Sequence, residues 1–302
     1  MLETARTRTP PAADCRPILD RINALPTIPL VAQQVGELIS DPRSDVTRIV
    51  NALRGDQSLT AKILKLVNSP YYSIPGGVSD IGRAVSVIGF NTLHQLVLTV
   101  SVFEALRGPR GGAVLDPKEL WKHSLGCGLV ADIVARRVKH PQPDTCFTAG
   151  LLHDVGKVAL LHAAPEPFLS AVTHARDKQV PLHDAERAFG LPAHDQVGTQ
   201  LARKWRFPQK IAAPIEHAYK ADPRDRAGLP PNLHPVVDMV MLANQICRRF
   251  AIGDSGEGVV PEVDKNLLER LGLLGYDVES LRGELLHAIE RSKAFRDLFE
   301  SS

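Results

Sequence analysis

The run AGLLHDVGKVAL at residues 149–160 places three polar side chains inside an otherwise apolar stretch. Residues three and four positions apart share one face of an α-helix. Lys157 therefore stacks with both His153 and Asp154, so an ammonium, an imidazole and a carboxylate group can converge on one point. Burying such groups costs several kcal/mol unless they are paired or bound to a metal ion. The run is either a metal and phosphate site or a partly exposed polar edge of a helix.

Three further histidines and one aspartate bear on that choice. His123 lies in LWKHSLGCG, His194 in GLPAHDQVG and His217 in APIEHAY, while Asp238 interrupts the apolar run HPVVDMVMLAN. An unpaired carboxylate in such a run would be costly. Each of these residues on its own is more often structural. Together with the His-Asp pair they form an ordered series in which each member lies on its own expected helix.

Composition sets limits on the class of protein. The 302 residues are 44% hydrophobic and 23% charged, which is typical of a globular protein. The formal net charge is +2, from 36 basic and 34 acidic residues without a basic tract, so nucleic acid is not an expected partner. The longest apolar run, LHQLVLTVSVFEAL, is too short and too polar for a membrane span. The four cysteines lie far apart without a CxxC pair, which argues against a disulfide framework or zinc knuckle and fits a reducing cytoplasm.

The hydrophobic pattern is helical along nearly the whole chain, beginning with the i, i+3, i+4, i+7 spacing at 46–53. Ser58 and Ser79 are the expected N-caps of the next two helices, and Gly89 is expected to end the second of them. Further helices are expected at about 92–106, 117–138, 145–162, 166–178, 194–205, 208–220, 235–250, 264–273 and 278–298. Because alternating strand patterns are absent, the sequence predicts an all-α fold.

The ordered series resembles the HD superfamily of metal-dependent phosphohydrolases. The resemblance implies one metal held by His123, His153, Asp154 and Asp238. It implies a second metal held by Asp154, His194 and His217. Imidazole and carboxylate ligands suit iron, manganese, zinc or nickel better than calcium, without selecting among them. If the protein is an enzyme, Asp154 and Lys157 are the expected catalytic residues, with the lysine opposing the developing negative charge on a phosphate oxygen.

A wider resemblance, from about residue 20 to 220, identifies the chain as similar to the HDOD domain, an HD-related helical module of bacterial signalling proteins. The blocks that carry it include LPTIP, DQSLTAKILKLVNSPYYS, IGRAVSVIGF, AGLLHDVGK and ERAFGLPAHDQVGTQLARKW. HDOD domains generally lack a demonstrated reaction, and many have lost metal ligands, whereas this chain keeps the full set. It also departs from the HD-GYP enzymes that hydrolyse cyclic di-GMP: Glu216 stands where their HH pair begins, and no GYP signature follows His217.

The expected organisation is a flexible tail at 1–16, an N-terminal helical subdomain of the HDOD type at 17–110, an HD-type subdomain with the metal site at 111–252, and a C-terminal extension at 253–302. Glycine and proline residues at 108–112 mark the main boundary. Tyr71 and Tyr72 either pack beneath the next loop, which we favour, or present a surface to a partner.

The function expected from these observations is regulatory. The chain would be a cytoplasmic signalling module with one or two transition-metal ions, acting mainly by binding other signalling proteins or a phosphorylated small molecule. One alternative is a working phosphohydrolase for a nucleotide or cyclic dinucleotide, and another is a scaffold whose histidines hold no metal. The metal, the partner and the oligomeric state are not specified by the sequence.

Overall fold

All regular elements in the described part of the chain are helices. The computed structural model describes residues 15–40, 45–108 and 112–300, and it contains no strand in these ranges. The all-α prediction is therefore confirmed. The expected tail at 1–16 lies almost wholly outside the described residues, as does the expected boundary at 110–111.

The helices are joined by connections of differing length, with short 3₁₀ helices η1, η2 and η3 between some of them. Their bounds are α1 (Arg16–Ala24), α2 (Leu30–Ser40), α3 (Val46–Arg54), α4 (Gln57–Val67), α5 (Ile81–Ala105), α6 (Pro117–Arg137), α7 (Pro143–Leu152), α8 (Val155–Ala163), α9 (Pro165–Lys178), α10 (Leu182–Ala188), α11 (His194–Lys204), α12 (Gln209–His217), η1 (Pro223–Asp225), η2 (Pro231–Leu233), α13 (His234–Arg249), α14 (Lys265–Arg270), η3 (Val278–Ser280), α15 (Leu281–Arg291) and α16 (Lys293–Glu300).

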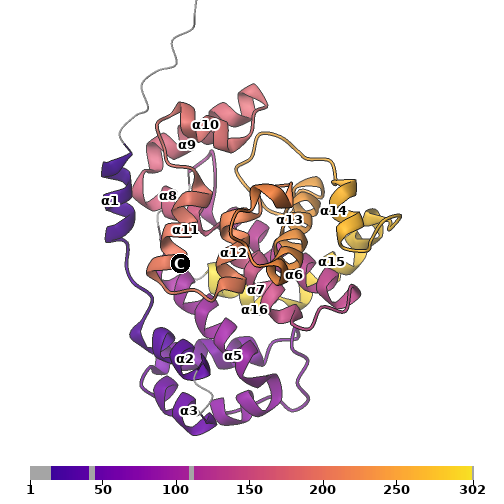
Figure 1. Cartoon of the computed structure of the whole chain (residues 1–302). Coiled ribbons are helices and arrows are strands. Elements are labelled where there is room, and N and C mark those ends of the chain that lie inside the picture. Colours follow the sequence, from indigo (N-terminus) through magenta and orange to yellow (C-terminus); the bar gives the residue numbers. More distant parts are fainter. Residues whose placement is uncertain (1–14, 41–44, 109–111, 301–302) are drawn as a thin grey trace, which may run out of the picture.

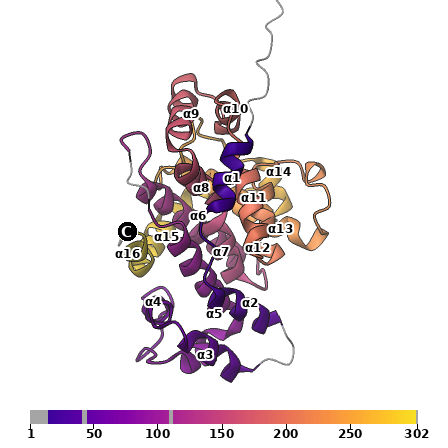
Figure 2. The same cartoon turned by 90° about the vertical axis from the view of Figure 1, so that its left-hand side faces the viewer.

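Two groups of helices stand out in the views of Figure 1 and Figure 2. Helices α2, α3, α4 and the first part of α5 form the lower lobe, and α6 to α14 form the upper one. Helix α1 does not join the lower lobe but packs against α8 and α11. At the other end of the chain, α16 packs against both α4 and α6. Segments from both ends of the described chain therefore brace the upper lobe.

Aspartates cap the early helices. The side chain of Asp56 accepts a hydrogen bond of 2.9 Å from the Leu59 amide at the start of α4. Asp80 accepts one from the Arg83 amide at the start of α5. The expected caps at Ser58 and Ser79 were wrong, because Asp56 and Asp80 have the extended backbone that lets each carboxylate reach an unpaired amide.

Helix α5 is bent at Gly89, whose φ of 78° is non-helical. The expected helix end at this glycine corresponds to the bend, since only glycine adopts that conformation without strain. Helix α5 also has the length and apolar composition of a membrane span, but 61% of its apolar window is buried inside the fold. That burial is what the core helix of a globular protein shows.

The loop after α4 is packed, as favoured from the sequence. The ring of Tyr71 lies 5.3 Å from that of Phe147 and 5.8 Å from that of Phe295, measured between centroids. The Arg291 guanidinium donates hydrogen bonds to the carbonyl oxygens of Pro70 and Tyr71. Aromatic packing and these hydrogen bonds tie the lower lobe to the C-terminal helices.

Helices α6 and α7 approach each other closely at glycines. A Cβ atom on Gly150 would lie 2.7 Å from the carbonyl oxygen of Cys127 and 2.9 Å from the Cα atom of Gly128. A side chain cannot be accommodated at that distance without moving one of the two helices. The close approach sets α7, which ends just before His153, directly against the middle of α6.

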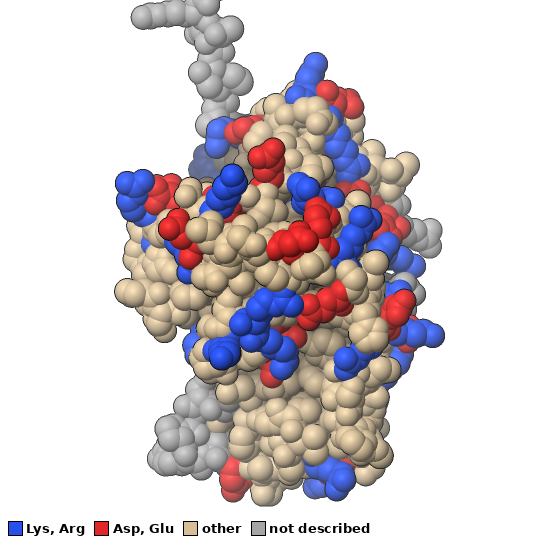
Figure 3. Space-filling view, turned by 90° about the vertical axis from the view of Figure 1, so that its right-hand side faces the viewer, with Lys and Arg blue, Asp and Glu red and all other residues tan. Residues whose placement is uncertain are grey.

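Charged groups of both signs are mixed over the face shown in Figure 3. The lower lobe, at the bottom of that view, is largely uncharged on this face. The expectation that nucleic acid is not a partner stays a prediction.

Candidate metal centre

His153 and Asp154, the HD pair, lie at the junction of two helices and not within one. His153 follows the last residue of α7, and Asp154 precedes the first residue of α8. The expected single helix at 145–162 was therefore wrong, because the chain changes direction where both flanking segments are equally apolar. The expected convergence still occurs: the Lys157 Nζ atom lies 2.9 Å from Asp154 Oδ2, and His153 Nε2 lies 3.4 Å from the same oxygen.

Lys157 is the centre of a buried network, with no exposed surface. Its ammonium group also donates to the Tyr219 hydroxyl at 2.9 Å, to the Ser255 carbonyl at 3.0 Å and to Glu257 Oε1 at 3.0 Å. The Tyr219 hydroxyl in turn donates to Asp154 Oδ1 at 2.8 Å. The lysine therefore has its full complement of acceptors within the protein.

The charges in this network stabilise one another. Burial by itself would lower the pKa of Lys157, but Asp154, Tyr219 and Glu257 hold it well above the ordinary value. Burial would likewise raise the pKa of Asp154, but neighbouring His153 and Lys157 hold it well below the usual range. Burial is also overcome at Glu257, where Lys157 and Arg248 lower the pKa to about 2. Lys157, Asp154 and Glu257 are therefore all charged at neutral pH.

His123 and His153 each direct Nε2 toward Asp154. The Nδ1 atom of His153 lies 2.7 Å from the Gly150 carbonyl, and that of His123 lies 3.3 Å from the Ile252 carbonyl. Since a carbonyl only accepts, Nδ1 of His153 carries the hydrogen, and its neutral ring keeps a lone pair on Nε2. In His123 both ring nitrogens face acceptors, because Nε2 also lies 3.2 Å from Asn244 Oδ1, so Nε2 offers its lone pair to a metal only when Nδ1 alone carries a hydrogen. His153 Nε2 is buried without a hydrogen bond among the described residues, and His123 Nε2 lies 4.0 Å from Asp154 Oδ2. These three side chains can bind a metal ion.

A cysteine joins this group. The Sγ atom of Cys127, one helical turn after His123 on α6, lies 3.4 Å from His123 Nε2. Donor atoms of His123, Cys127 and His153 all lie within 4.8 Å of one another. Burial, helped by the neighbouring Cys247, raises the pKa of the Cys127 thiol well above the usual range. The sequence analysis missed this residue, although the His-x3-Cys spacing on one helical face could have indicated it.

Asp238, expected among the metal ligands, lies elsewhere. It forms ion pairs with Arg226 at 2.7 Å and with Arg270 at 2.8 Å, which occupy both of its oxygens. The group on α13 that contacts His123 is Asn244, whose Oδ1 lies 3.2 Å from Nε2. Six residues on a helix correspond to a rotation of about 240°, so Asp238 and Asn244 face different directions. A buried carboxylate does call for a partner, but here the partner is arginine.

The residues expected for a second metal are separated by other side chains. His194 Nδ1 contacts Glu186 at 2.8 Å, and its buried Nε2 has no hydrogen bond among the described residues. The ring of Tyr219 lies 4.8 Å from that of His194, while its hydroxyl binds Asp154. Tyr219 thus lies between the two residues that were expected to share this metal.

His217 likewise contacts neither Asp154 nor His194 in the hydrogen bonds and ion pairs of the described residues. Its Nδ1 accepts from the Lys220 ammonium at 3.1 Å, and its Nε2 lies 4.0 Å from Glu216. Burial, followed by the charge of Lys220, lowers the pKa of His217. A different trio, His183, Glu186 and His194, brings donor atoms within 4.8 Å of one another.

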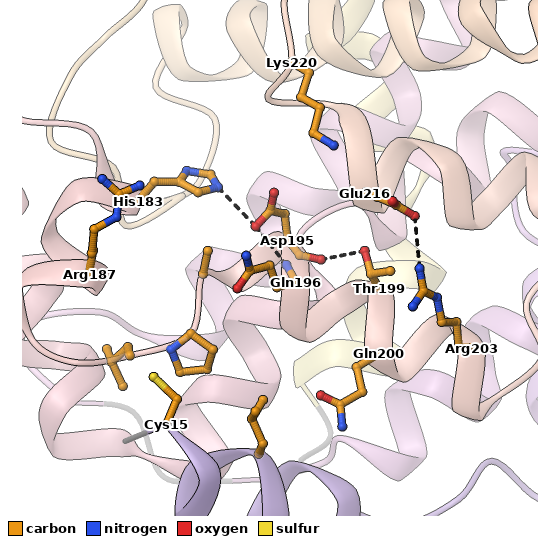
Figure 4. A pocket seen from close by; sticks show the side chains of 14 residues that line it. Cys15, His183, Arg187, Asp195, Gln196, Thr199, Gln200, Arg203, Glu216 and Lys220 are labelled. Atoms are coloured by element: carbon orange, nitrogen blue, oxygen red, sulfur yellow. Dashed lines mark hydrogen bonds and ion pairs between the residues drawn. The ribbon is translucent and has the colours of Figure 1, made fainter. Parts of the chain in front are cut away.

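A cavity of about 800 Å³ lies beside this second group of histidines. The ring of His183, which lines the cavity, packs against those of His194 and Tyr219, with centroids 4.2 and 4.8 Å away. Figure 4 shows that His183 points toward Asp195 and that Glu216 points toward Arg203. The labelled side chains around the cavity are Cys15, His183, Arg187, Asp195, Gln196, Thr199, Gln200, Arg203, Glu216 and Lys220.

Acid should destabilise the metal-free protein through His153. Burial lowers the pKa of this imidazole from 6.5 to about 4, so the unfolded chain binds a proton in this range and the folded chain does not. The corresponding stability is present above pH 6.5 and is lost as the pH falls toward 4, to an extent of about 3 kcal/mol. Denaturant unfolding at several pH values gives the slope of the free energy of unfolding against pH. His153→Gln should remove the part of this slope that lies between pH 4 and 6.5. The matched change at exposed His287 should leave the slope as in the wild type, and equal slopes in all three proteins would contradict the assignment.

Comparison with known proteins relates the fold to solved structures. An HDOD domain protein of unknown function from Geobacter sulfurreducens is 28% identical, with a TM-score of 0.70 over 95% of this chain and 99% of that one. A protein from Shewanella amazonensis SB2B, provisionally named a phosphohydrolase, is 20% identical, with a TM-score of 0.68 over 95% of this chain and 99% of that one. A protein from Marinobacter aquaeolei VT8, provisionally named a signal transduction protein, is 20% identical, with a TM-score of 0.71 over 97% of this chain and 68% of that one.

Curated relatives are longer than this chain. An uncharacterised protein of Treponema pallidum (strain Nichols) is 24% identical over 252 residues, which are 83% of this chain and 47% of that protein. The uncharacterised protein YuxH of Bacillus subtilis (strain 168) is 24% identical over 146 residues, or 48% of this chain and 32% of that protein. The chain thus spans less than half the length of these relatives. The HDOD domain family matches residues 25–221, about the region of the resemblance noted in the sequence, and the chain therefore belongs to the HDOD family.

Proposed function

We propose that this chain is a regulatory HDOD module of bacterial signalling that holds one transition-metal ion through His123, His153 and Asp154. The observation that carries the proposal is the state of Lys157, whose ammonium is buried, held by four acceptors and placed 2.9 Å from Asp154 Oδ2. A lysine so held does not reach a substrate phosphate without breaking a buried network. The site is therefore better suited to binding than to turnover.

The donor set fits one metal better than two. The unpaired lone pair of His153 Nε2 supports a ligand role, since a buried acceptor without a partner is costly. A carboxylate oxygen has more than one lone pair, so Asp154 Oδ2 can contact both Lys157 and a metal ion. A second ion between Asp154 and His194 would have to displace Tyr219. When bound, such a metal would supply a fixed positive charge that links folding to the state of its ligands.

The cavity of Figure 4 supports a binding role for the same lobe. Arg187, Arg203 and Lys220 at its wall are cations suited to a phosphorylated small molecule, which we propose as one class of partner, with other signalling proteins as the second class. His183 links this wall to Tyr219 and so to Asp154. A ligand in the cavity would then lie against the ring of His183, which packs on Tyr219, and Tyr219 binds the proposed metal ligand Asp154.

Metal analysis of protein purified without an affinity tag is the direct test. We expect about one equivalent of a transition metal, with iron, manganese, zinc and nickel all measured. Chelation should lower the Tm on the order of 5 °C if the metal had been present at about 100 times its Kd. Metal-free protein whose Tm does not respond to any of these ions would contradict the proposal.

Incubation of metal-replete protein with cyclic di-GMP and a panel of nucleotides distinguishes the regulatory module from a phosphohydrolase. We expect no turnover of any of them above that of an Asp154→Asn variant. Turnover near 1 per second, within the ordinary range of enzymes, that is lost in the variant would replace the regulatory proposal with a hydrolytic one.

A further inference from the structure

The metal site proposed above has a sulfur atom at its edge. Cys127 is fully buried on α6, and its Sγ lies 3.4 Å from His123 Nε2. Together with His153 Nε2, these donor atoms lie within 4.8 Å of one another. The cysteine is fixed in place by the close approach of α7, because the Cβ position of Gly150 lies only 2.7 Å from the Cys127 carbonyl oxygen.

Three separations between the proposed donors can be compared with the edges of a tetrahedral site. With metal–nitrogen and metal–oxygen bonds near 2.0–2.2 Å and a metal–sulfur bond near 2.3 Å, tetrahedral donors are separated by roughly 3.4–3.6 Å. The separation is 3.4 Å between Cys127 Sγ and His123 Nε2, and 3.4 Å between His153 Nε2 and Asp154 Oδ2. His123 Nε2 and Asp154 Oδ2 are 4.0 Å apart, within a small side-chain rotation of the same value.

The charge balance of the site with a divalent ion bound also favours a thiolate. Asp154 and Glu257 are opposed by Lys157 and by Arg248, which lies 3.8 Å from Glu257. Glu186, behind His194, adds one more buried negative charge. A divalent ion would leave this buried group with one excess positive charge, which an ionised Cys127 would cancel. Burying a balanced set of charges costs much less than burying an uncompensated one.

We propose that Cys127 is a ligand of the metal, so that the site has two imidazoles, one carboxylate and one thiolate. The inference rests on the proposed metal-binding function. On binding, the Cys127 thiol proton goes to solvent and the sulfur lone pair forms the bond to the metal. A tetrahedral site containing thiolate selects zinc over manganese, which prefers oxygen ligands. Neighbouring Cys247 is in hydrogen-bond contact with Cys127 and is not a ligand in this site.

Cobalt substitution tests the assignment through the sulfur itself. Chelator-stripped full-length protein is loaded with Co²⁺, and the near-ultraviolet absorption is recorded for the wild type and for Cys127→Ser and Cys247→Ser. We expect a sulfur-to-cobalt charge-transfer band in the wild type and in Cys247→Ser, and its loss in Cys127→Ser. The Zn²⁺ affinity of Cys127→Ser should fall by at least about 100-fold, the upper end of what losing an outer partner of a ligand costs.

The outcomes separate this inference from the function on which it rests. Bound cobalt without a sulfur band in the wild type would overturn the role of Cys127 and leave metal binding intact. Absence of cobalt binding would overturn both. Should Cys127→Ser fail to fold, X-ray absorption of the zinc-loaded wild type decides the matter without a variant. A sulfur neighbour near 2.3 Å supports the inference, and a shell of only nitrogen and oxygen at 2.0–2.2 Å contradicts it.

Discussion

Replacing Lys157 with methionine is expected to lower the free energy of unfolding of the metal-free protein by about 3–5 kcal/mol. The substitution keeps the length and apolar stem of the side chain but removes the ammonium group from a site with no exposed surface. Asp154 and Glu257, both buried, would lose a partner at 2.9 Å and 3.0 Å. Arg248 remains 3.8 Å from Glu257, but Asp154 would be left as a buried carboxylate without a cation, which is far more costly than the loss of the pair as a whole.

The chain offers a matched control at Lys122. This lysine also lies three residues after an acid, Glu119, with an N–O distance of 3.2 Å, but about half of each side chain is exposed. Lys122→Met should therefore change the free energy of unfolding by less than about 1 kcal/mol. Denaturant unfolding of both variants measures the difference. A Lys157→Met protein that is as stable as Lys122→Met would mean that burial does not amplify this interaction.

Most of the fold was predictable because it follows from local patterns. The helix expected at 194–205 corresponds to α11 (His194–Lys204), where one apolar face is bounded by polar residues. The break between α7 and α8 was not predictable from that pattern, because apolar residues flank His153 and Asp154 on both sides. Helix α10 was missed since seven residues are too few to establish a period.

The candidate site was predictable only where its chemistry is concentrated in short motifs. His123, His153 and Asp154 do converge, because few other arrangements satisfy buried imidazole and carboxylate groups. Tyr219 and Glu257 complete the network from 62 and 100 residues beyond Lys157, and no local signal connects them to it.

Asp238 shows the limit of the same reasoning. A carboxylate on an apolar helix requires a partner, but the sequence does not say whether that partner is a metal ion or a cation. Arg226, itself fully buried in its side chain, supplies the answer from a loop that carries no motif.

Among the glycines that the structure describes, Gly156 is the one where an added methyl group should be most disruptive, and Gly156→Ala is expected to cost at least about 3 kcal/mol. A Cβ atom at this position would lie 1.8 Å from the carbonyl oxygen of His194 and 2.7 Å from the amide nitrogen of Gly198. Both are backbone atoms, so no side-chain rotation relieves the overlap. Helix α8, which carries Lys157, would have to separate from α11, which carries His194.

The matched control for this change is Gly283→Ala in helix α15, where the added Cβ atom has nothing within 4 Å. There the alanine should stabilise the protein by about 0.5–1 kcal/mol, because it restricts the unfolded chain and favours the helix. Thermal and denaturant unfolding of the two variants should therefore shift in opposite directions. Because α8 directly follows His153 and Asp154 and carries Lys157, Gly156→Ala should also reduce the metal content of whatever protein remains folded. Normal stability together with full metal content in Gly156→Ala would mean that the contact between α8 and α11 does not position the site.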